Sequence, residues 1–215
     1  SKIRERGHEV GFHGYTHQVL GKLTPSRFRE EVERFNELLQ STLGEKCMGF
    51  RAPSLSLNND TLWALEILAE EGYLYDSSLT PAWTPLYGDP RIPREPYKPS
   101  MEDLTKRDEE GRIWEFPLTT YGFGWMRIPL SGFFLRLLPP SIVERALKNL
   151  NSKGRPGILY IHTWELDPET PRYDLGWYRS FITYHGIEDV RDKLVKILSK
   201  FSFTSFEDLL GRGLS

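Results

Sequence analysis

The chain has 215 residues, of which 39% are hydrophobic and 27% are charged. A sequence of this length and balance can bury one sizeable core and does not require two domains. Its formal net charge of −2 gives no electrostatic reason to expect a nucleic acid or an anionic membrane as partner. The single cysteine, Cys47, excludes an intrachain disulfide framework, and no apolar run approaches the roughly 20 residues that span a bilayer.

The first part of the chain predicts helices that alternate with short apolar strands. Residues 1–7 are typical of the end of a helix that a glycine terminates, and residues 9–14 favour a short buried strand. Thr24 caps a predicted helix that has Pro25 at its first position and ends near Gly44.

The same alternation continues through the next thirty or so residues. Residues 47–52 and 73–77 predict strands, and residues 61–71 predict a helix between them. Strands and helices that alternate through connections of a few residues favour a parallel α/β sheet or barrel.

Residues 79–112 interrupt this alternation with six of the fifteen prolines, which predicts a long insertion with no core of its own. Residues 113–119 then predict a strand, and Ser141 is expected to cap a helix. Residues 157–163 form the most apolar strand expected in the second half. An amphipathic helix is predicted over 186–200, followed by a last helix that a capping box starts at residues 204–207.

Two histidines four residues apart, His13 and His17, follow the first predicted strand and are the strongest candidates for a metal site. Neutral imidazole nitrogens suit zinc, and histidines with this spacing can converge on one ion. Catalytic zinc sites usually have a third protein ligand, often a carboxylate, and only Glu5 and Glu9 precede this segment. The alternative is a pair of loop histidines with ordinary hydrogen-bond partners.

Other polar residues are predicted at or near strand ends, where parallel α/β folds gather their functional groups. His162 could act as a general acid, and Arg51 could hold a catalytic carboxylate through two hydrogen bonds. Glu115 is expected on a buried strand, where His162 is a reasonable partner, and Asp76 follows the third strand. Each residue also has an ordinary structural interpretation. His162 would be hydrogen-bonded at the rim of the sheet, and Arg51 would form a surface salt bridge. Glu115 would face outward, and Asp76 would only cap the end of its strand.

Five segments, in chain order, resemble the polysaccharide deacetylases of the NodB-homology type, carbohydrate esterase family four, most closely the branch associated with exopolysaccharide biosynthesis. The segments are Gly7–His17, Phe50–Ser54, Tyr75–Ser78, Glu115–Thr120 and Tyr160–Glu165. Each segment alone is a modest signal, but the ordered set is specific and covers nearly the whole chain.

The resemblance implies a distorted (β/α)7-type barrel and a divalent metal, commonly zinc, held by an Asp and two His. His13 and His17 match the two His, Arg51 matches the arginine that orients the catalytic base, and His162 matches the general acid. Glu115 lies near the place of the carboxylate that steadies this acid. The candidates for substrate contacts are Pro53, Ser54, Asp76, Trp125, Trp164 and Glu165.

The family's acidic motif, which supplies the catalytic base and the third metal ligand, has no match in this sequence. By the family's layout the first two β/α units are missing, so we expect one incomplete catalytic domain over residues 1–215 and an enzyme fragment that is inactive alone. The missing strands would expose a sheet edge, which predicts a homo-oligomer that covers it.

The function that the resemblance implies is metal-dependent removal of N-acetyl groups from a hexosamine-containing polysaccharide or glycan. Aromatic side chains of the irregular segments 121–136 and 164–185 would stack on the carbohydrate, unless they belong to the core. Two other functions stay open: an amidohydrolase of the same fold that acts on small cyclic ureides or imides, and a non-catalytic glycan-binding pseudoenzyme.

Overall fold

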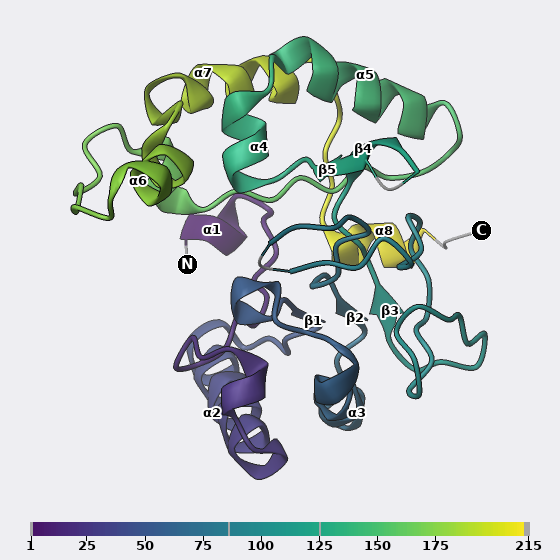
Figure 1. Ribbon diagram of the computed structural model, residues 1–215. Helices are drawn as coiled ribbons and strands as arrows, with labels where there is room; N and C mark the ends of the chain where they lie inside the picture. The colour runs from purple at the N-terminus through teal and green to yellow at the C-terminus, as the bar shows by residue number, and fades with distance from the viewer. Residues whose placement is uncertain (1, 86, 125, 213–215) are drawn as a thin grey trace. The chain divides into compact units, whose positions relative to one another are not determined.

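The computed structural model describes residues 2–85, 87–124 and 126–212 (Figure 1). The single domain expected for the chain consists of two compact units, one formed by Ser1–Pro117 with Thr204–Ser215 and the other by Leu118–Phe203. We call them the first and second unit and describe each by itself. Within the described residues, no helix combines the length and the apolar character needed to cross a bilayer.

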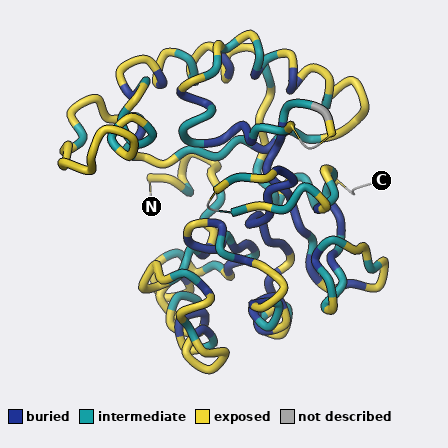
Figure 2. The backbone as a smooth tube through the Cα atoms, viewed as in Figure 1, coloured by how far each residue is buried: buried dark blue, intermediate teal, exposed yellow. Residues whose placement is uncertain are grey.

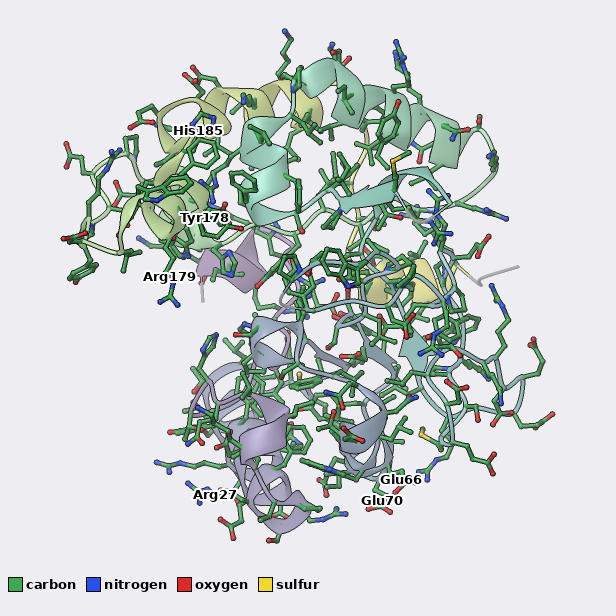
Figure 3. The ribbon with its side chains drawn as sticks, in the orientation of Figure 1. Arg27, Glu66, Glu70, Tyr178, Arg179 and His185 are labelled. Carbon is green, nitrogen blue, oxygen red and sulfur yellow. The ribbon has the colours of Figure 1, made fainter. Side chains whose placement is uncertain are left out.

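The helices of the first unit follow the sequence prediction closely. They are α1 (Lys2–Glu5), α2 (Pro25–Leu43), α3 (Trp63–Glu70) and α8 (Phe206–Gly211), with 3-10 turns η1 (Leu20–Lys22), η2 (Pro53–Leu55) and η3 (Asn59–Thr61). The Thr24 hydroxyl caps α2 by accepting the Arg27 N–H, and Gly44 ends the helix at a φ of 70°. α2 and α3 lie side by side, and Arg29 of α2 bridges to Glu70 of α3, which Figure 3 labels.

A parallel sheet in the order β1-β2-β3 forms the centre of the first unit. Its strands are β1 (Gly49–Phe50), β2 (Tyr75–Asp76) and β3 (Trp114–Glu115), all shorter than predicted. The predicted strand 9–14 is wrong, because only Phe12 pairs with Phe50 and Gly14 leaves the extended region at a φ of 76°. The alternation of strands and helices, and hence the α/β class, is confirmed.

The core of the first unit joins the sheet, α2, α3 and the proline-rich segment (Figure 2). Phe12 packs against Phe28 and Phe50, with ring centroids 6.1 and 5.3 Å away. No helix or strand is found within the described residues of 79–112, as predicted from its prolines. Several of its side chains are nevertheless buried in this same core: Leu79, Ile92, Tyr97 and Leu104.

The second unit contains an antiparallel hairpin and helices around a separate core. Its elements are β4 (Thr120–Phe123), β5 (Met126–Pro129), α4 (Gly132–Leu137), α5 (Pro140–Asn151), η4 (Thr163–Leu166), α6 (Trp177–Tyr184) and α7 (Ile187–Leu198). The core joins side chains of the hairpin's end, α4, α5 and α7: Leu130, Leu135, Val143, Ala146, Leu147 and Ile197.

Two predictions for the second unit are wrong. Residues 157–163 form no strand; Tyr160 makes a single bridge to Ser131, and the Thr119 hydroxyl accepts the Ile158 N–H that a ladder would use. Helix α5 begins at Pro140 rather than after Ser141, because proline has no N–H to leave unbonded at a helix start. The helix predicted over 186–200 is confirmed as α7.

Candidate active site

The two histidines of the first unit lie with their rings close together. The Nδ1 atom of His13 is 2.6 Å from the carbonyl oxygen of Arg51. Because a carbonyl only accepts, this Nδ1 carries the proton and Nε2 is the acceptor nitrogen of His13. The ring of His17 is 4.9 Å from that of His13, centroid to centroid, at 75° between the planes. The spacing of the histidines in the sequence therefore becomes a close pair in space.

The loop between the two histidines is bound by Glu31 of α2. One carboxylate oxygen accepts the backbone N–H groups of Tyr15 and Thr16, at 3.0 and 3.3 Å. The other accepts the Thr16 hydroxyl at 2.6 Å. Sequence reasoning missed Glu31, although one signal was present: it lies beside Val32 on the apolar face of α2.

Arg51 and the turn that follows it lie close to this loop. The Arg51 guanidinium donates from Nε to the Ser77 carbonyl and from Nη2 to the Ser77 hydroxyl, both at 2.6 Å. Pro53 is so close to Gly14 that a Cβ there would lie 2.9 Å from the Pro53 Cγ, at a φ of 76° that already favours glycine. Ser54 is exposed and has a φ of 55°, a strained backbone of the kind that functional sites often hold.

Asp76 and Glu115 face each other across β2 and β3 and are both fully buried. Burial, and then the neighbouring Asp76 charge, raises the pKa of Glu115 well above its usual value. Burial also raises the pKa of Asp76, against donors that include Ser78. Within the described residues no N–H or O–H group donates to Glu115 Oε2, and a proton shared with the neighbouring Asp76 carboxyl would satisfy this oxygen.

This burial bears on two sequence predictions. Asp76 was expected to contact substrate and Glu115 to be catalytic, with His162 as its partner. Both carboxyls are 0% exposed, and Glu115 Oε1 accepts the Leu79 N–H at 2.9 Å. Their placement supports a role in holding the ends of β2 and β3 together, not a contact with substrate.

His162 of the second unit has a different carboxylate as its partner. Its Nδ1 lies 2.8 Å from Glu165 Oε1, and the same oxygen accepts the His162 N–H at 3.1 Å. The Tyr160 hydroxyl lies 2.8 Å from Nε2. Burial opposes the ionisation of Glu165, but hydrogen bonds from His162 and Arg136 outweigh it and lower the pKa of this carboxyl.

Arg136 of α4 binds the second oxygen of Glu165. Its Nε donates to Glu165 Oε2 at 2.6 Å, and its two remaining nitrogens donate to the carbonyls of Ile182 and His185, the latter labelled in Figure 3. Glu165 was expected to bind substrate, but it is 1% exposed and both its oxygens are used. Trp164 is half-buried with its ring 5.7 Å from that of His162, and Trp125 lies outside the described residues.

The residues present fit part of a metal site. The outer hydrogen bond from His13 Nδ1 to a carbonyl is the kind that orients metal-binding histidines. Among the residues that the structure describes, no group of three or more His, Cys, Asp or Glu side chains could hold an ion. The His13–His17 pair therefore offers two imidazoles to a metal, and a third ligand is not part of the described cluster.

Comparisons with known proteins agree with the first part of this description. The polysaccharide deacetylase family matches residues 1–73. A peptidoglycan deacetylase-like protein, FGM2 of Gibberella zeae, is 35% identical over 78 residues, which are 36% of this chain and 22% of that protein. A peptidoglycan deacetylase of Helicobacter pylori is 34% identical over 77 residues, 36% of this chain and 25% of that protein. The chain thus matches a quarter or less of each relative.

The rest of the chain matches a family described as a domain of unknown function (DUF3473), over residues 77–211. A solved structure assigned to a polysaccharide deacetylase of Mycobacterium smegmatis has a TM-score of 0.57 at 19% identity. It aligns with 98% of this chain, which covers 64% of that structure, and it shows a shared α/β fold. The chain therefore belongs to the polysaccharide deacetylase family and carries the DUF3473 domain in its second part.

Proposed function

We propose that this chain supplies the two histidine ligands of a divalent metal, zinc by preference, in an enzyme that removes N-acetyl groups from a hexosamine-containing polysaccharide or glycan. The observation that carries the proposal is the close pair of His13 and His17, with Nδ1 of His13 fixed on the Arg51 carbonyl. The family of the chain supports the reaction, and an exopolysaccharide is one substrate of this class. The distorted (β/α)7-type barrel remains part of the proposal.

The donor set of the pair suits this metal, because neutral imidazole is among the ligands that zinc prefers. A bound zinc ion would polarise an acetyl carbonyl and acidify water. Arg51 would orient a carboxylate base with a guanidinium that Ser77 holds in place. The exposed residue Ser54 would contribute its backbone N–H group to the acetyl oxygen that becomes negative.

His162 would give the proton that the leaving amine takes up. Its Nδ1 donates to the Glu165 carboxylate, so the ring is held in one orientation and Nε2 is the nitrogen that exchanges a proton. Glu165 thus takes the role that the resemblance gave to Glu115, and Arg136 keeps it ionised. Trp164, beside the His162 ring, remains a candidate for stacking on a sugar.

Zinc titration calorimetry on the 215-residue chain tests the metal role. We expect weak binding with one ion per chain, because two imidazoles are one ligand short of a usual site. His13→Ala and His17→Ala should each lower the affinity by more than about tenfold, the least that loss of an outer partner costs. His8→Ala is the matched control, since His8 is exposed in the same segment. Equal affinities in all four proteins would contradict the proposal.

Acetate release from N-acetylglucosamine oligosaccharides tests the reaction. We expect negligible turnover by this chain alone. A longer form of the protein that also carries an acidic motif of the family should release acetate, and His13→Ala in that longer form should abolish the release. Turnover by the 215-residue chain alone would show that the acidic motif is not required. A longer form that binds zinc but releases no acetate would favour a glycan-binding role.

A further inference from the structure

One charged side chain of α2 faces inward where apolar residues surround it. Glu31 is 2% exposed, and its neighbours Phe28 and Val32 on the same helix face belong to the core of the first unit. Burying a carboxylate is unfavourable unless hydrogen-bond donors replace water. A structural reason for Glu31 must therefore lie in the groups that it binds.

Those groups all come from the loop that separates the two histidines. Consecutive N–H groups, of Tyr15 and Thr16, point to one oxygen, and the Thr16 hydroxyl binds the other at 2.6 Å. One turn further along α2, the Arg34 guanidinium lies 4.2 Å from the centre of the Tyr15 ring. Two side chains of α2 thus hold one short stretch of the loop.

The loop needs such support because its backbone is unfavourable at His17, whereas the left-handed turn at its other end is made by a glycine. Gly14 has a φ of 76° and His17 a φ of 55°. A left-handed conformation is uncommon for a residue other than glycine and persists where surrounding contacts enforce it. In this conformation of the loop the His17 ring lies against that of His13, and Glu31 binds the two residues directly before His17.

We infer that Glu31 is a positioning residue that fixes the loop so that the imidazoles of His13 and His17 converge. This rests on the proposed metal role of the histidines and goes beyond it, because it assigns the geometry of the pair to a residue of a different element. Charged acceptors make stronger hydrogen bonds than neutral ones, so a carboxylate holds two N–H groups and a hydroxyl better than an amide does.

The first test is Glu31→Gln in the full chain, studied without metal. Its amide has one acceptor oxygen, and its NH2 group would face a donor of the loop. We expect faster hydrogen exchange at the Tyr15 and Thr16 amides and loss of the nuclear Overhauser contact between the His13 and His17 rings. Glu33→Gln, an exposed position on the same helix, should leave both unchanged.

The second test is the zinc affinity, which we expect to fall by about 10- to 100-fold in Glu31→Gln. Val32→Ala serves as a control for lost stability, because it opens a void next to Glu31 without removing any of the hydrogen bonds that Glu31 makes to the loop. Its melting temperature should fall while its zinc affinity stays at that of the wild type. The zinc affinity of Thr16→Val should lie between those of the wild type and Glu31→Gln. Thr16→Ser, which keeps the hydroxyl, should retain the wild-type affinity.

Each result decides the inference. Wild-type amide exchange, ring contact and zinc affinity in Glu31→Gln would overturn it, as would an equal loss of affinity in Val32→Ala. If the wild-type chain binds no zinc, the proposed function fails, while amide exchange and the ring contact still decide the role of Glu31. If Glu31→Gln does not fold, Thr16→Val gives the same measurements, and unchanged values there overturn the inference.

Discussion

Each unit of the molecule buries acidic side chains, and burial has opposite outcomes for their ionisation in the two units. In the first unit Asp76 and Glu115 lie against each other, and burial together with the neighbouring carboxyl raises the pKa of Glu115. In the second unit Glu165 is as deeply buried, yet His162 and Arg136 outweigh that burial and its pKa is lowered. The partner, and not the degree of burial, decides whether a buried carboxyl is charged.

Removing the Arg136 guanidinium, which pairs with Glu165 in the second unit, should have the largest effect on stability. Arg136→Met leaves Glu165 buried without its guanidinium and two carbonyls, those of Ile182 and His185, without their donor. We expect a loss of about 3–5 kcal/mol in the free energy of unfolding of the second unit, as for other broken buried pairs. Hydrogen exchange of the α7 amides measures it separately from the first unit.

The double variant Arg136→Met with Glu165→Met is the control for this prediction. Two apolar side chains leave no buried charge, so the second unit should regain part of the lost stability. If the double variant is as unstable as the sum of its single changes, the two residues are not coupled, and the contrast between the units would fail.

The sequence predicted the helices of the first unit better than either buried acidic site. Thr24, Pro25 and Gly44 act within their own helix, so local signals were sufficient to bound α2. Each acidic site depends on contacts between distant segments: Glu115 meets Leu79, and Glu165 meets Arg136 of another helix. No local pattern encodes such partners, and the sequence did not single out Glu165 as the carboxylate that lies beside His162.

The histidine pair shows the same limit on a smaller scale. The spacing of His13 and His17 predicted a pair, and the structure brings their rings together. The side chain that binds the loop, Glu31, comes from α2, and only its position on an apolar helix face distinguished it from the other acidic residues there. Strands were over-predicted for the related reason that side-chain hydroxyls accept backbone N–H groups that a ladder would use, those of Ile158 and Ala52.

A smaller effect is expected at the donor of the first acidic site. The Ser78 hydroxyl donates to Asp76 at 2.5 Å and accepts the Ala52 N–H at 2.7 Å. Ser78→Ala leaves that N–H and one carboxyl oxygen buried without a partner, so we expect a loss of about 1–3 kcal/mol. Chemical denaturation, with exchange of the α2 amides as the probe, measures this loss of stability in the first unit. Ser41→Ala, at an exposed hydroxyl of α2, should change stability by less than about 0.5 kcal/mol.

The most direct test of the contrast is the pH dependence of the stability of each unit. The pKa of Glu115 is raised on folding, so its contribution to stability is present below the unfolded pKa and is lost as the pH rises through the folded pKa. The pKa of Glu165 is lowered, so its contribution is present above the unfolded pKa and is lost as the pH falls through the folded pKa. Glu115→Gln should therefore make the first unit more stable relative to wild type as the pH rises, by about 1 kcal/mol or more for each unit of pKa difference removed.

Glu165→Gln should do the reverse in the second unit: its deficit against wild type is large at neutral pH and shrinks in acid, because wild-type Glu165 is then protonated as well. Denaturant unfolding at a series of pH values, with amide exchange in α2 and in α7 as the probe of each unit, gives the slope of stability against pH for the two units separately. Parallel pH profiles for wild type and Glu115→Gln would mean that Asp76 and Glu115 share no proton. The two buried sites would then differ in their partners but not in their charge.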